Sequence, residues 1–149
     1  MNPSDTISIL NGLIETLKDG QEGFRVASED VKDTQLKSLF SRISLERSQF
    51  VGELQQEVTR LGESDPEKTS SVAGALHRGW MNLKSALAGG DEHAILAECE
   101  RGEDSAKEEY QEALEKELPQ NIREIVERQY ASIKAAHDQV RDLRDARAK

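Results

Sequence analysis

The three histidines of the chain are the first residues to test for chemistry, because an imidazole beside carboxylates can hold a metal ion. In helical bundles that bind two iron ions, a Glu-x-x-His spacing puts a carboxylate and an imidazole on one helix face. Three positions before His77, His93 and His137 stand two glycines and a lysine, so this spacing does not occur. We therefore predict no catalytic residue and no complete di-iron site.

Five polar side chains nevertheless fall on or beside the apolar faces of the predicted helices: Gln21, Arg47, Glu103, Gln129 and His137. Counting residues from the turns places Gln21, Glu103 and His137 near one level, and Arg47 with Gln129 near another. One hypothesis is a reduced metal site with Glu103 and His137 as ligands. The other is a hydrogen-bonded polar layer in which Arg47 or His137 satisfies Glu103. We favour the polar layer, because an inward arginine cation repels Fe²⁺.

Four further acids, Glu15, Glu22, Glu46 and Glu100, project at the edge or outside of the apolar faces. Helix surfaces are usually rich in glutamate, so we expect these residues to be solvated rather than ligands. A rotation of one helix by one residue would change that expectation.

Trp80 and Cys99 are expected to be structural. Trp80 is predicted to anchor a connecting helix across the bundle, with His77 one turn before it. Cys99 lies on an apolar face with Ile95 and Ala106, and buried thiols are usually unreactive. Neither residue is therefore predicted to bind a cofactor or to act as a nucleophile.

A narrow basic strip closes the chain, with arginines at every third position followed by a C-terminal lysine: Arg141, Arg144, Arg147 and Lys149. Cations near a helix C-terminus are favoured by the helix dipole, and aspartates are interleaved among these arginines. We therefore expect an ordinary helix end and no nucleic-acid binding by this strip.

These residues are carried by five predicted helices. Apolar side chains recur at three- and four-residue steps, beginning with Ile7, Leu10, Ile14 and Leu17, which is the pattern of an amphipathic helix. The pattern predicts helices over about 5–30, 34–61, 66–88, 92–117 and 119–147. Ser4 or Asp5, then Asp33 and Asp91, are the predicted N-caps, and Gly62 and Gly89-Gly90 are predicted helix ends.

Composition agrees with an all-α protein. The chain has 149 residues, of which 36% are hydrophobic, only 4% aromatic and 33% charged, with three prolines. The net charge of −9 repels polyanions, and no apolar run reaches the length of a membrane span. The single cysteine and the absence of a secretory pattern at the N-terminus lead us to expect a cytoplasmic protein.

The order of the helices suggests how they connect. Two hairpins of long helices, joined by one connecting helix, would make the second and fourth helices parallel, as in single-crossover bundles. The segment 91–117 is strongly acidic and 119–149 is net basic, which favours pairing of the last two long helices. A simple up-and-down array of five helices is the alternative.

Several segments carry a family resemblance: residues 17–24 (LKDGQEGF), 45–50 (LERSQF), 75–80 (ALHRGW), 89–95 (GGDEHAI) and 100–104 (ERGED). The stretch from about Thr6 to Leu118 resembles a group of bacterial ferritin-like proteins that carry a domain of unknown function. The resemblance implies a four-helix bundle with distant kinship to ferritin and rubrerythrin. We therefore expect one ferritin-like domain over residues 1–149, with an additional helix in the crossover between the second and fourth helices.

Two functions follow as expectations. The first is a non-catalytic cytoplasmic helical bundle that acts by association with a protein partner or with itself, for example in a stress response, and that needs no cofactor. The alternative is a metal-binding, iron-type ferritin-like protein with a reduced site.

Overall fold

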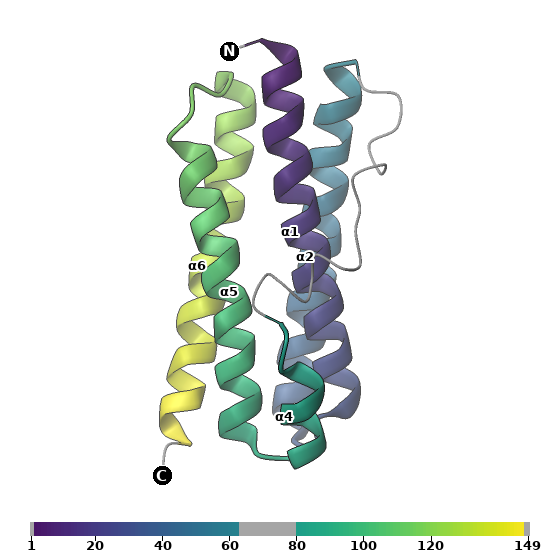
Figure 1. Ribbon diagram of the computed structural model, residues 1–149, viewed down its shortest axis with the longest axis vertical. Coiled ribbons are helices and arrows are strands. Elements are labelled where there is room, and N and C mark those ends of the chain that lie inside the picture. Colours follow the sequence, from purple (N-terminus) through teal and green to yellow (C-terminus); the bar gives the residue numbers. More distant parts are fainter. Residues whose placement is uncertain (1, 63–79, 148–149) are drawn as a thin grey trace.

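The computed structural model describes residues 2–62 and 80–147, and all regular structure in these residues is helical (Figure 1). The all-α prediction is therefore confirmed. The helices are α1 (Pro3–Asp30), α2 (Thr34–Arg60), α4 (Leu83–Gly89), α5 (Glu92–Leu114) and α6 (Gln120–Ala146). Within these described residues, no helix is both long enough and apolar enough to cross a lipid bilayer.

Four long helices lie side by side along the long axis of the molecule (Figure 1). The hairpin of α1 and α2 packs beside the hairpin of α5 and α6, mainly through the contact between α1 and α5. The helices α2 and α5 run in the same direction, and short α4 lies beside the N-terminal end of α5 (Figure 1).

Polar caps determine where three of the long helices begin. The Asp33 carboxylate accepts the Leu36 N–H at 2.9 Å, and the Asp91 carboxylate accepts the His93 N–H at 3.0 Å, which confirms both predicted caps. The predicted cap of the first helix is wrong. Asn2 accepts the N–H of Asp5 at 2.8 Å, and α1 starts at the following proline, whose fixed φ suits a first helical position.

Glycines end two helices as predicted, because Gly62 has φ 110° and Gly90 has φ 71°, both in the region that L side chains rarely adopt. The fourth predicted helix ends early, at Leu114 rather than 117. There the guanidinium of Arg123 donates to the carbonyls of Leu114, at 3.1 Å, and of Lys116, and so satisfies backbone acceptors in the turn.

The predicted connecting helix, 66–88, falls largely outside the described residues, since 66–79 belong to the undescribed part. In the described part the prediction is wrong over 80–82, because helix α4 begins only at Leu83. The Asn82 N–H instead donates to the carboxylate of Glu98 on α5 at 2.8 Å, which fixes an irregular backbone against the bundle.

Trp80 packs between the two hairpins. Its indole lies between Gly23 on α1 and Gly102 on α5: an added Cβ would be 2.6 Å from the indole carbons at Gly23 and 2.5 Å from the indole nitrogen at Gly102. The Phe24 ring meets it edge to face, with centroids 5.1 Å apart. Two residues without side chains therefore create the slot that buries the only tryptophan of the chain.

Buried apolar side chains form two clusters. One surrounds the N-terminal half of α1 and includes Leu10, Ile14, Leu54, Tyr110 and Ile133. The other surrounds its C-terminal half and includes Phe24, Phe40, Trp80, Leu96 and Val140. Ser44 and Arg47 on α2 and Glu103 on α5 are buried polar residues that lie along the helices between these two clusters.

Candidate functional site

The polar residues predicted to face the interior have different environments. Arg47, Glu103, Gln129 and His137 are all buried, and the first three of these are at most 1% exposed. Gln21 is partly exposed, at the edge of the bundle. The structure separates the four buried residues into three different contacts rather than one shared site.

Arg47 and Glu103 form a buried pair between α2 and α5. The two terminal guanidinium nitrogens donate to the two carboxylate oxygens at 2.7 and 2.6 Å. Gly20 leaves room for this cation, because a Cβ there would lie 3.3 Å from it, and the Phe24 ring centroid is 5.8 Å away. Burial alone would lower the Arg47 pKa, but the charge and hydrogen bonds of Glu103 reverse this and raise it. Both oxygens of Glu103 are thus occupied by an arginine.

Gln129 has a separate structural role. Its side-chain oxygen accepts the Tyr110 hydroxyl at 2.7 Å, and its nitrogen donates to Glu53 at 2.9 Å. Burial raises the Tyr110 pKa far above its usual value, so the phenol stays a neutral hydrogen-bond donor. This contact joins α2, α5 and α6 without leaving a free ligand atom on Gln129.

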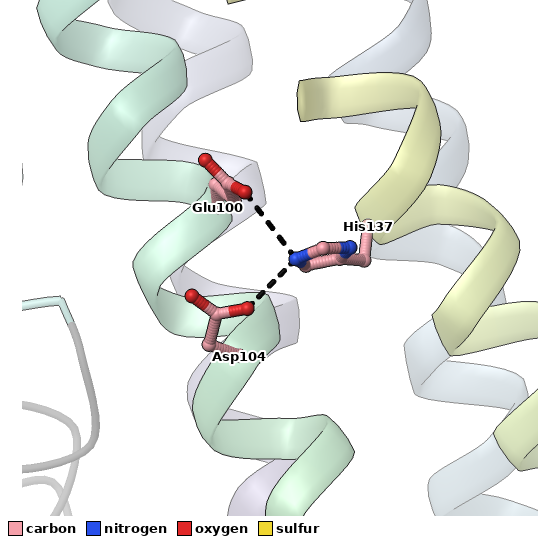
Figure 2. Close-up of side chains that lie close together, drawn as sticks. All are labelled: Glu100, Asp104 and His137. Atoms are coloured by element: carbon pink, nitrogen blue, oxygen red, sulfur yellow. Dashed lines mark ion pairs between the residues drawn. The ribbon is translucent and has the colours of Figure 1, made fainter. Parts of the chain in front are cut away.

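His137 meets a different set of acids from the one predicted. Glu100 and Asp104 project from α5 toward the ring of His137 on α6 (Figure 2). The His137 Nε2 lies 2.7 Å from an oxygen of Asp104 and 3.4 Å from an oxygen of Glu100. The structure therefore does not join Glu103 with His137 as a ligand pair.

Helical spacing positions the two acids. Residues four apart on a helix lie on the same face, one turn above the other, so Glu100 and Asp104 both reach the α6 ring. The His137 side chain is 7% exposed and that of Glu100 is 13% exposed, whereas Asp104 is 53% exposed and faces solvent. The three groups thus form a half-open cluster between two helices.

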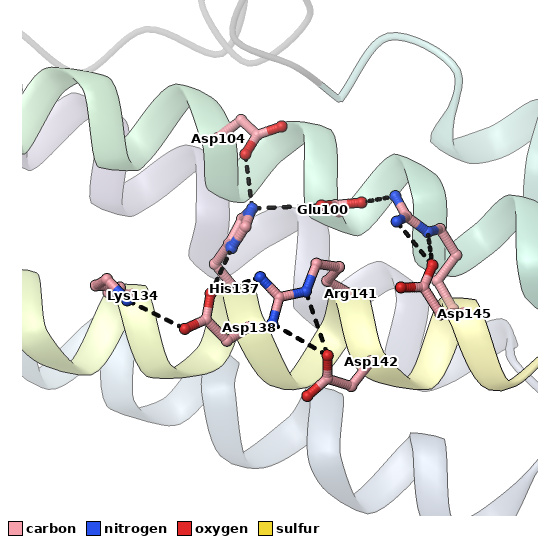
Figure 3. Close-up of polar contacts among 9 residues, drawn as sticks. Glu100, Asp104, Lys134, His137, Asp138, Arg141, Asp142 and Asp145 are labelled. Atoms are coloured by element: carbon pink, nitrogen blue, oxygen red, sulfur yellow. Dashed lines mark hydrogen bonds and ion pairs between the residues drawn. The ribbon is translucent and has the colours of Figure 1, made fainter.

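The other ring nitrogen of His137, Nδ1, also contacts a carboxylate. His137 Nδ1 lies 3.0 Å from Oδ1 of Asp138 (Figure 3). Arg141 donates to the same oxygen at 3.3 Å, and Lys134 donates to the other oxygen, Oδ2, at 3.2 Å. These contacts, with the hydrogen bond to His137 the largest, lower the Asp138 pKa to about 2. Asp138 is thus a carboxylate at neutral pH and fixes the orientation of the ring.

The arginines of the predicted basic strip are each paired with acids in the structure. Arg144 contacts Glu100 and, at 2.8 Å, Asp145, while Arg147 is 2.7 Å from Glu92. Arg141 contacts its neighbours Asp138 and Asp142 (Figure 3). Lys149 lies outside the described residues. The three arginines of the strip are therefore neutralised by the acids of α5 and α6.

The sequence-based prediction paired His137 with Glu103 and so missed the partners that the structure gives it. That prediction placed Glu100 at the edge or outside of its apolar face and did not include Asp104. The usable signal was the Glu-x-x-x-Asp spacing of 100–104 opposite a histidine on the antiparallel neighbour.

Ligand atoms of Glu100, Asp104 and His137 all lie within 4.8 Å of one another. Two carboxylates and one imidazole are a donor set that suits divalent first-row metals. Cys99, although near in sequence, is fully buried, and burial, with the charges of Glu103 and Glu98, raises its thiol pKa well above its usual value. The thiol is thus an unsuitable further ligand.

The chain matches the model of a protein family. The family model described as "Domain of unknown function (DUF2383)" matches residues 5–116. The matched range contains Glu100 and Asp104 but ends before His137. No curated protein matches the chain.

Proposed function

Because the chain belongs to the family described as a domain of unknown function (DUF2383), we propose its function from its geometry: binding of a divalent transition-metal ion between α5 and α6. The observation that carries the proposal is the imidazole of His137. Its Nε2 faces the carboxylates of Asp104 and Glu100, while its Nδ1 is tied to Asp138.

The donor set selects the class of ion. Ca²⁺ and Mg²⁺ prefer oxygen ligands alone, whereas Zn²⁺, Co²⁺, Mn²⁺ and Fe²⁺ accept imidazole together with carboxylate. A carboxylate on the far ring nitrogen of a metal-binding histidine orients the ring and makes it a better ligand, which is the place of Asp138 here. The three protein ligands leave coordination positions for water.

The metal affinity is expected to depend on pH. Imidazole and carboxylate groups bind a metal ion in their deprotonated forms, so the affinity should fall as the pH is lowered.

We further propose that the bundle is ferritin-like and that residues 1–149 form one domain. Parallel α2 and α5 joined by a long connection support this topology (Figure 1). In such a bundle the interior is the usual metal position. Here the pair of Arg47 and Glu103 occupies the interior, so the proposed site lies outside it and supports reversible binding rather than oxidase chemistry.

The test is titration of the purified metal-free protein with Co²⁺, followed by calorimetry and by visible absorption. We expect one equivalent to bind to the wild type, and His137→Gln or Asp104→Asn to weaken binding by roughly a hundredfold or more, since even outer-shell substitutions cost 10–100-fold. Binding should also raise the melting temperature of the wild type, but not that of His137→Gln or Asp104→Asn.

His93→Gln is the matched control, because His93 lies on α5 but outside the cluster. It should bind Co²⁺ like the wild type. Absence of binding by the wild type at neutral pH, or equal loss in His93→Gln, would count against the proposed site.

Association with a second copy of the chain is the second candidate. The observation that favours it is an open groove of about 560 Å³ between α2 and α6, whose walls include Leu39, Arg42, Gln139 and Leu143. We expect a concentration-dependent dimer in size-exclusion chromatography with light scattering, and Arg42→Glu, at an exposed residue of the groove, should shift it to monomer. A monomer at all concentrations would remove this candidate.

A further inference from the structure

We infer that Arg144 competes with the metal ion for the carboxylate of Glu100. This competition sets the ion concentration at which the site between α5 and α6 fills. This inference rests on the proposed metal binding. It adds a residue that is not a ligand and that acts through Glu100.

The Glu100 carboxylate contacts two partners, His137 and Arg144. One of its carboxylate oxygens faces His137 Nε2 at 3.4 Å, and the other accepts from a terminal guanidinium nitrogen of Arg144. The two partners come from the same helix, α6, so the carboxylate lies between them. A metal ion bound to Glu100 would therefore be separated from the positive charge of Arg144 by a single carboxylate group.

The direction of the effect follows from the charges. A guanidinium group stays protonated in proteins, so its positive charge repels a divalent ion throughout the pH range of a binding measurement. The Glu100 side chain is only 13% exposed, which limits screening by water and salt. Arg144 thus lowers metal affinity by repulsion and by holding an oxygen that the ion would otherwise use.

Asp145 makes the competition reversible. The Arg144 guanidinium already donates to one oxygen of Asp145 at 2.8 and 3.1 Å. When a metal ion binds Glu100, Arg144 keeps its hydrogen bonds to Asp145. The guanidinium charge therefore still has a carboxylate partner. The contact between α5 and the C-terminal turn of α6 is then weakened while the metal is bound.

The experiment measures Co²⁺ affinity by calorimetry at fixed pH and salt in the wild type, Arg144→Met, Arg144→Lys and Arg147→Met. Removing one positive charge at this distance should tighten binding by roughly tenfold in Arg144→Met. Arg144→Lys keeps the charge and should stay within about threefold of the wild type. Arg147→Met makes the same charge change one turn on, at a residue that contacts Glu92, and should have little effect.

The outcomes separate the two proposals. Tighter binding in Arg144→Met alone supports the inference. Unchanged or weaker binding in Arg144→Met, with normal binding by the wild type, would overturn the inference and leave the metal site standing. No binding by the wild type would overturn both. Circular dichroism of each variant verifies that the helices are intact.

Discussion

Glu103→Gln is expected to lower the free energy of unfolding by about 3–5 kcal/mol, because it leaves the buried cation of Arg47 without a counter-charge. Both side chains are 1% exposed, so water cannot replace the lost carboxylate. The Nε of Arg47 already has no hydrogen-bond partner among the described residues. Urea unfolding followed by circular dichroism at 222 nm measures the change.

Two further variants identify the cause. In the double variant Arg47→Met with Glu103→Leu no buried charge remains, and stability should return to within about 1–2 kcal/mol of the wild type. Arg128→Met breaks a more exposed pair with Glu53, at 2.9 Å, and should cost only about 0–1 kcal/mol. A Glu103→Gln protein as stable as Arg128→Met would contradict the assignment of a tightly coupled interior pair.

Gly102→Ala should be the second strongly destabilising change, with a loss of about 3 kcal/mol. The new methyl group would overlap the indole of Trp80, which is held on its other side by Gly23. The indole must shift or leave its slot, and the gain in helix propensity, at most about 1 kcal/mol, does not compensate. Since Trp80 is the only tryptophan, a red shift of its fluorescence reports the displacement directly.

Gly52→Ala provides the matched control, because nothing lies within 4 Å of a Cβ at this position in the middle of α2. That substitution should stabilise the protein by about 0.5–1 kcal/mol and leave the fluorescence unchanged. If Gly102→Ala behaved in the same way, the Trp80 indole would not be tightly packed between α1 and α5.

Local signals in the sequence predicted the elements well. Asp33 and Asp91 cap helices because a carboxylate before an amphipathic run has few better partners than the free N–H groups beside it. For the first helix only the predicted cap is wrong, since Ser4, Asp5 and Asn2 are all competent caps and only the position of Pro3 decides among them. The charge contrast between 91–117 and 119–149 appears as the contacts of Arg144 and Arg147 with α5.

Partners within the interior were harder to predict. The helix faces indicated that Arg47 and Glu103 point inward, but a pairing across two helices depends on their relative height and rotation. A small change in either would exchange Glu103 for Glu100 or Asp104 as the neighbour of His137. Glu100, Glu103 and Asp104 are thus close to interchangeable from the sequence, while their surroundings in the structure are very different.

The slot around Trp80 also bears on how the protein folds. Its two glycine walls belong to helices far apart in the chain, so neither hairpin alone can enclose the indole. Contacts between distant segments form late, after the entropy of closing the intervening loops has been lost. Stopped-flow refolding should therefore show the ellipticity of the hairpins appearing first, and the blue shift of the indole marking the later moment when the two halves join.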